Sequence, residues 1–199
     1  ARARKVQQQA LARAREHLAF LAQLPLSPAE RAALDEATAA WQRLASALDA
    51  RLELGSLQAA DAAAQTALLA AEALTLAVQA QGARQPLHVI DLCGRLRMHA
   101  QRLVKQALLA MLGAAPDAAI GIQELAQAFS DGLAQVESLP LDSPDIREAL
   151  AASKEAWLQM LRALRASDPA GLVHAGQHLL DRVEQLTLQC EHSLQVLMA

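Results

Sequence analysis

The sequence has almost no aromatic character: tyrosine is absent, and aromatic residues make up 2% of its 199 positions. Its interior has to be built mainly from leucine, alanine, valine and isoleucine, because hydrophobic residues nevertheless reach 53%. Alanine and leucine favour helices, whereas the β-branched residues that favour strands are sparse. The composition therefore excludes a β-sandwich, makes an α/β sheet a poor fit and predicts an all-α protein.

Strong charge, cysteine clusters and long apolar runs are missing too. A formal net charge of −3 gives no support for direct nucleic-acid binding. No apolar run approaches the roughly 20 residues that span a bilayer, so no membrane span is expected, and the first residues lack the apolar segment of a signal peptide. Cys93 and Cys190 could pair, but two buried, reduced thiols are favoured, which indicates a cytoplasmic location. A periplasmic sensor domain taken from a larger membrane receptor would look the same.

Catalytic and metal-binding patterns are also missing. The sequence contains no glycine-rich phosphate loop, no nucleophile elbow and no HExxH motif. His174 and His178 are four residues apart and could share a helix face, but no further ligands accompany them. We therefore predict a protein that is not an enzyme and that holds neither a metal nor a cofactor.

Helical periodicity covers nearly the whole chain, and the prolines and glycines fall mainly at its interruptions. Ser27, Ser143 and Asp168 each place a capping oxygen directly before a proline, as the starts of helices do. Short connections favour antiparallel neighbours. The predicted helices cover residues 2–24, 28–53, 56–81, 86–113, 117–138, 144–166 and 169–197.

The chain also repeats itself. Its only two tryptophans, Trp41 and Trp157, fall in register with other matching residues and are expected to be equivalent buried anchors. The repeat predicts two tandem antiparallel bundles, with three helices over residues 1–82 and four over residues 83–199. The first copy lacks a counterpart of helix 86–113. Its incompletely covered apolar faces predict a homodimer or docking by a further helix.

The most informative stretch is GRLRMHAQR, residues 94–102, which places three arginines on an otherwise apolar helix. Arginine keeps its charge at ordinary pH, and its planar guanidinium suits a small planar oxyanion. On a helical wheel, one apolar stripe is formed by Val89, Leu92, Cys93, Leu96, Ala100, Leu103, Val104 and Ala107. Arg97 lies at the edge of this stripe, while Arg95 and Arg102 lie together beyond the opposite edge. We therefore expect Arg97 to be partly buried, with an anion or an acidic partner compensating its charge.

The longer stretch VIDLCGRLRMHAQRLVK resembles the signature helix of the PilJ-like sensor domains, which are the N-terminal domains of type IV pili methyl-accepting chemotaxis transducers. It is also similar to the nitrate-binding helix of nitrate- and nitrite-sensing histidine kinases. The matching positions are Gly94, Arg95, Arg97, Met98, Gln101, Arg102 and Lys105. The departures include Asp91, Cys93, His99 and Ala100. The resemblance implies an antiparallel helical bundle that has this helix first.

The resemblance further implies a domain that senses nitrate or nitrite and signals through a downstream partner protein. In the kinases one anion lies between two copies of the helix across a dimer interface, and the arginine that contacts it maps onto Arg97. The candidate ligand-binding residues are therefore Arg97, as the main contact, and Arg95, Arg102, Gly94, Met98 and Gln101. The alternative is a ligand-free helical scaffold for protein interactions, whose arginines pair with acids on neighbouring helices.

Overall fold

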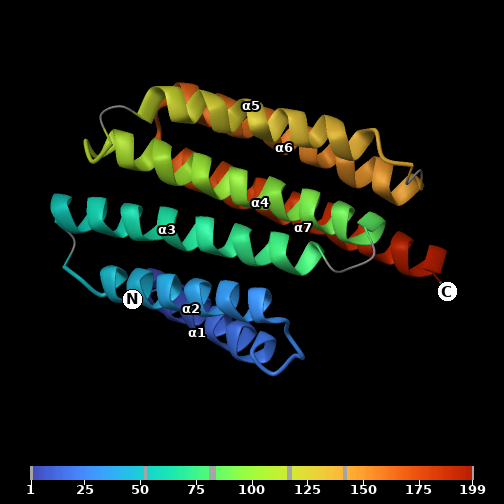
Figure 1. Cartoon of the computed structure of the whole chain (residues 1–199). Helices are drawn as coiled ribbons and strands as arrows, with labels where there is room; N and C mark the ends of the chain where they lie inside the picture. The colour runs from blue at the N-terminus through green and yellow to red at the C-terminus, as the bar shows by residue number, and fades with distance from the viewer. Residues whose placement is uncertain (1, 52, 81–83, 116–117, 141–142, 199) are drawn as a thin grey trace. The chain divides into compact units, whose positions relative to one another are not determined.

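Every regular element in the part of the chain that the structure describes is a helix, which confirms the predicted all-α class. The computed structural model describes residues 2–51, 53–80, 84–115, 118–140 and 143–198. Within these ranges the helices are α1 (Arg2–Leu21), α2 (Pro28–Leu48), α3 (Leu54–Gln79), α4 (Arg84–Met111), α5 (Ala118–Glu137), α6 (Pro144–Ala166) and α7 (Pro169–Met198) (Figure 1).

The predicted capping residues begin three of these helices. The Ser27 hydroxyl accepts a hydrogen bond from the Glu30 amide at 3.3 Å, and the Glu30 carboxylate accepts one from the Ser27 amide at 2.7 Å. The Ser143 hydroxyl accepts from the Ile146 amide at 3.2 Å. The Asp168 carboxylate accepts from two backbone amides of the first turn of α7, each at 3.0 Å. These bonds satisfy amides that a helix start otherwise leaves without a partner.

The chain divides into two compact units, Ala1–Gly82 and Ala83–Ala199. The first unit, here called the first bundle, contains α1, α2 and α3, and the second bundle contains α4 to α7. Each has a hydrophobic core of its own. The repeat relation between the two stays a prediction.

The second bundle has a broad core into which all four of its helices contribute. Helix α4 packs against both α5 and α7, and α6 packs against α7. The Phe129 ring lies against the Trp157 indole, with 4.5 Å between the ring centroids. The buried residues of α4 are Val89, Leu92, Cys93, Leu96, Ala100, Leu103, Ala107 and Leu109. All but the last belong to the predicted apolar stripe, so the orientation of this helix follows from its sequence.

Two glycines let neighbouring helices approach α4 closely. A Cβ atom at Gly132 of α5 would lie 2.8 Å from Leu96 Cδ2, and one at Gly176 of α7 would lie 2.5 Å from Val104 Cγ2. Both distances are shorter than van der Waals contact, so neither position has room for a larger side chain unless its neighbour moves. The arginine helix is therefore held tightly from two sides.

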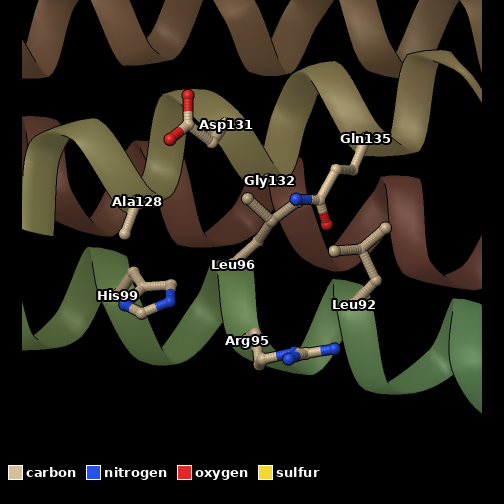
Figure 2. A pocket seen from close by; sticks show the side chains of 8 residues that line it. All are labelled: Leu92, Arg95, Leu96, His99, Ala128, Asp131, Gly132 and Gln135. Atoms are coloured by element: carbon tan, nitrogen blue, oxygen red, sulfur yellow. The ribbon is translucent and has the colours of Figure 1, made fainter.

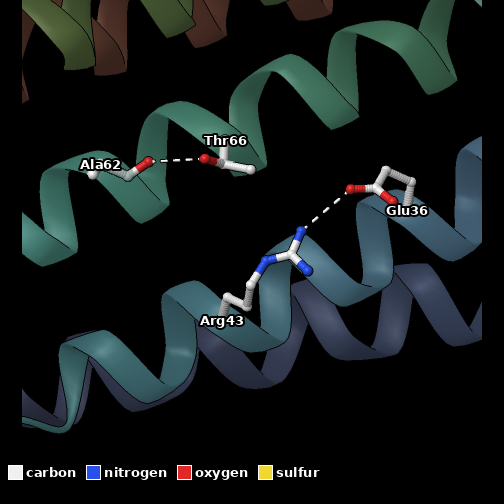
Figure 3. A network of polar contacts seen from close by, with 4 residues as sticks. All are labelled: Glu36, Arg43, Ala62 and Thr66. Carbon is white, nitrogen blue, oxygen red and sulfur yellow. Dashed lines mark hydrogen bonds and ion pairs between the residues drawn. The ribbon is translucent and has the colours of Figure 1, made fainter.

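The first bundle has a much smaller core. Helix α2 packs against α3 and, over a shorter contact, against α1. The buried core residues are Leu34, Ala37, Ala40, Ala70 and Leu74. Its exposed polar contacts are mostly local: Arg43 pairs with Glu36 at 3.2 Å on α2, and the Thr66 hydroxyl donates to the Ala62 carbonyl at 3.1 Å on α3 (Figure 3). Exposed pairs of this kind add little stability.

The two tryptophans differ in their surroundings. Trp157 is buried against Phe129, whereas Trp41 is half-buried and lies outside the core cluster of the first bundle. The Trp41 indole N–H is nevertheless buried and finds no hydrogen-bond acceptor among the described residues. The prediction of a buried core anchor is therefore right for Trp157 and wrong for Trp41, because a small, alanine-rich core cannot enclose an indole.

Helix α3 corrects the expectation about apolar runs. Leu54–Gln79 is long and apolar enough to cross a membrane by length and composition, with a mean hydropathy of 1.2 over its best window. Its many alanines are each mildly apolar, so they raise the mean hydropathy without forming a continuous run of strongly apolar residues. A single helix that passes this test does not establish a membrane span. Leu69 and Leu76 lie seven residues apart on one face of α3 and are 65% and 66% exposed.

Candidate functional site

Helix α4 presents the arginine motif along its exposed side. Arg97 is exposed, so the expectation that it would be partly buried was wrong. Around the helix axis, Arg97 is the neighbour of Val104, a half-buried residue at the edge of the apolar stripe. A long side chain at such an edge extends its guanidinium into water. The charge of Arg97 therefore needs no compensation within the bundle.

Arg97 lies on a continuous exposed face of α4. Ile90, Gly94 and Gln101 share this face at helical spacing, and all three are exposed. We call Ile90, Gly94, Arg97 and Gln101 the Arg97 face. A Cβ atom at Gly94 would meet nothing within 4 Å, so the space above the helix at this point is open. Among the residues that the structure describes, no carboxylate forms an ion pair with Arg97.

Arg95 points to a different side of α4 and has an acidic partner on its own helix. Its Nη2 atom lies 2.6 Å from an Asp91 carboxylate oxygen, one helical turn earlier. Asp91 is one of the positions at which the motif departs from the family pattern. Its side chain is only 20% exposed, so the pair is partly shielded from water. Arg95 therefore already has its charge balanced.

Arg102 is half-buried and also lies away from the Arg97 face. Its Nη1 atom is 3.9 Å from the sulfur of Met98, which is half-buried one turn earlier. The six candidate residues therefore do not meet at one point. Gly94, Arg97 and Gln101 share one side of α4, Arg95 and Arg102 lie on another, and Met98 lies between the two groups.

A hollow of about 270 Å³ lies between α4 and α5 on the side of Arg95. It is lined by Leu92, Arg95, Leu96, His99, Ala128, Asp131, Gly132 and Gln135 (Figure 2). His99 and Leu96 point from α4 toward α5, and Gln135 points back toward α4, whereas Arg95 runs along α4. The Asp131 carboxylate at its wall accepts a hydrogen bond from the Gln127 amide at 2.8 Å. An anion in this hollow would meet that negative charge, which disfavours binding there.

Sequence reasoning did not anticipate Asp131 and Gln135 as neighbours of the motif. They lie on α5, and a single sequence carries no signal for which residue of one helix faces which residue of another. Of the two histidines considered as ligands, His174 is exposed and His178 is half-buried. In the described part of the chain, no three metal-binding side chains come together.

The second bundle matches the model of a known protein family. The family model PilJ, described as the type IV pili methyl-accepting chemotaxis transducer N-terminal domain, matches residues 83–198. The match covers more than half of the chain and includes α4 with its arginine motif, while α1 to α3 lie outside it. No curated protein and no solved structure matches the chain.

Proposed function

Because the chain belongs to the PilJ family of chemotaxis-transducer N-terminal domains, we propose that its second bundle senses nitrate or nitrite and signals through a partner protein. Family membership makes residues 83–198 a signalling domain of the chemotaxis-transducer type, and domains of this type are not catalytic. The anion, the dimer that encloses it and the downstream partner belong to the proposal. Arg97 is its proposed main contact.

The observation that carries this proposal is the state of the three motif arginines. Arg95 is paired with Asp91 at 2.6 Å, and Arg102 is half-buried beside Met98. Arg97 is exposed and forms no ion pair with a described carboxylate. It is therefore the arginine of the motif with donors best placed for a ligand from outside the bundle.

An exposed guanidinium alone holds a small anion weakly, because water screens the charge and competes for its donors. A second surface that excludes water is needed to make a site. A second copy of α4, related by twofold symmetry, would supply it by laying its own Arg97 face on the first. Two opposed guanidinium groups repel each other until an anion lies between them. Anion binding and dimer packing are coupled in this arrangement.

Gly94 supports the same arrangement independently. A glycine within a helix costs about 0.5–1 kcal/mol relative to alanine. No atom of the described residues lies within 4 Å of a Cβ placed at Gly94, so the packing that the structure describes gives no reason for this cost. A second helix whose backbone approaches α4 closely at Gly94, one turn before Arg97, would explain why a glycine stands there.

Signalling would follow from a change in the packing of α4. The close contacts at Gly132 and Gly176 hold α4 against α5 and α7, so a shift of α4 at the dimer seam is carried to its neighbours. An anion that binds one packing arrangement better than another shifts the population between them. A downstream signalling protein reads that shift.

The description of the family as a transducer domain favours the second location considered from the sequence, which is a periplasmic domain of a membrane receptor. We therefore propose that the chain is part of a membrane receptor and lies on the periplasmic side. The cytoplasmic location rested on reduced cysteines alone and stays a prediction.

Thermal unfolding of the whole chain with and without nitrate tests the ligand. A ligand at about 100 times its dissociation constant adds about 2.7 kcal/mol to the free energy of unfolding, which raises the midpoint by several degrees. Nitrite and chloride at the same ionic strength separate a specific site from a general salt effect. If neither nitrate nor nitrite raises the midpoint above chloride, the ligand-free scaffold becomes the better account.

A further inference from the structure

The two cysteines lie together in the core of the second bundle, although they are far apart in the sequence. Cys93 of α4 and Cys190 of α7 are 0% and 1% exposed, and both are reduced. The two helices that carry them pack against each other directly. Both side chains belong to the same core cluster of the second bundle. Two thiols that share one core cluster on two packed helices are candidates for a cross-link between those helices.

A hydrogen bond between the two thiols shifts their pKa values in opposite directions. It lowers the pKa of Cys93, against the opposing effects of burial and of the negative charge of Glu191, and Thr187 adds a smaller lowering effect. The same bond, together with burial, raises the pKa of Cys190. Cys93 is therefore the thiol that ionises first, and the thiolate is the reactive form in disulfide exchange.

We propose that Cys93 and Cys190 form a reversible disulfide that staples α4 to α7 when the chain meets a thiol–disulfide oxidant. This inference goes beyond the proposed sensing function and does not depend on it. It rests on the shared place of the two side chains in one core cluster, on their burial and on the packing of the two helices.

The reaction balances as an exchange with the disulfide of a small or protein oxidant. The Cys93 thiolate attacks one sulfur of that disulfide, forms a mixed disulfide and releases the first thiolate of the oxidant. That thiolate takes the proton of Cys190, and the Cys190 sulfur then attacks Cys93. The second thiolate of the oxidant leaves and takes the proton that Cys93 lost to solvent. Two protein thiols have become one disulfide, and the oxidant disulfide has become two thiols.

The staple would act directly on the arginine helix. Cys93 precedes Gly94, so the bond would anchor α4 to α7 at the start of the motif. The loop closed between residues 93 and 190 is long, and the stabilising effect of a cross-link on the unfolded chain grows with loop length. The oxidised chain should therefore be more stable to heat, and α4 should have less freedom to shift relative to α7.

The reduced chain of 199 residues is refolded from denaturant in buffers of reduced and oxidised glutathione, so that burial does not block the reaction. Alkylation followed by mass spectrometry counts the free thiols, and circular dichroism gives the thermal midpoint. We expect an intramolecular Cys93–Cys190 disulfide, a midpoint higher by on the order of 10 °C, and complete reversal when the oxidised chain is unfolded and treated with a reductant.

Cys93→Ala and Cys190→Ala are the matched controls, because each leaves one thiol and cannot form the bond. Their midpoints should not rise in oxidising buffer. Three results would overturn the staple: refolding with both thiols free, formation only of intermolecular or glutathione adducts, or a disulfide that lowers the midpoint. The readout contains no nitrate, so failure of anion sensing leaves it unaffected.

Discussion

At the residue scale, Arg97 is exposed because it lies at the outer edge of the buried stripe of α4, and no ion pair within the described part of the bundle holds it. It lies one turn after Gly94 on the exposed side of α4, beside the edge of a buried stripe. Its type was informative from the sequence, since arginine suits a planar anion. Its exposure was not, because the edge of a stripe can become either a buried or an exposed position when neighbouring helices pack.

Replacing Arg97 by lysine tests whether the planar donors matter. Lysine keeps the positive charge but loses the paired donors that hold a planar oxyanion. We expect Arg97→Lys to weaken nitrate binding at least about tenfold, corresponding to about 1.4 kcal/mol, without changing the thermal midpoint of the free protein. Arg95→Lys is the matched control, because Arg95 already pairs with Asp91. Equal weakening by both variants in titration calorimetry would contradict the assignment.

Replacing Gly94 by alanine separates the needs of the bundle from those of the interface. The free chain has space for the added methyl group, so Gly94→Ala should raise the free energy of unfolding by about 0.5–1 kcal/mol. The same variant should weaken nitrate binding, since the methyl group stands where a second helix approaches. Gly121→Ala is the control, because that helical glycine also has open space beside it. Chemical denaturation and calorimetry measure the two effects, and unchanged nitrate binding in Gly94→Ala would count against a close interface.

At the element scale, the helices could be predicted well where capping residues or prolines mark their ends. Ser27, Ser143 and Asp168 cap helices as predicted. Helix α2 instead ends at Leu48, short of the predicted residue 53. This end could not be predicted because no glycine or proline marks it in the sequence. The buried face of α4 could be predicted from the period of its apolar residues. The α5 residues that contact this face could not be predicted, since contacts between helices depend on how the helices pack.

The start of α2 should make the first bundle sensitive to acid. Hydrogen bonds from Ser27 lower the pKa of the Glu30 carboxylate below its ordinary value. A lowered carboxyl pKa contributes stability above the pKa of the unfolded chain, about 4.3, and that contribution is lost as the pH falls through the folded value. We expect Glu30→Gln to unfold at lower denaturant concentration than wild type at pH 7, with the difference shrinking toward pH 3. A difference that stays constant over this range would contradict the role of the charge.

The contact between α4 and α5 should tolerate little change. An alanine at Gly132 would bring a methyl group within 2.8 Å of Leu96, which is fully buried and has little freedom to move. We expect Gly132→Ala to destabilise the second bundle by about 1–3 kcal/mol. Urea denaturation monitored by circular dichroism measures the change, with Gly121→Ala as the control for an alanine placed on the same helix. A variant as stable as wild type would show that α4 and α5 can separate without cost.

At the scale of the whole molecule, the two bundles differ in what is expected of them. The second bundle is the signalling domain, and we expect the first to bind a surface outside itself. The second bundle has a full core and the family match over residues 83–198. The first has a small core and an exposed apolar face at Leu69 and Leu76 on α3. Composition predicted the all-α class of the molecule. The proposed ligand and the proposed dimer rest on the motif and its placement on α4, which composition does not contain.

The central claim is that one anion lies between the Arg97 faces of two chains. Titration calorimetry of nitrate into the whole chain, with its mass in solution determined by light scattering, tests this most directly. The account predicts saturation at one nitrate for every two chains, a dimer strengthened by nitrate, and loss of both in Arg97→Ala with the helical content unchanged. Binding of one nitrate to each monomer, or binding that Arg97→Ala leaves intact, would contradict it.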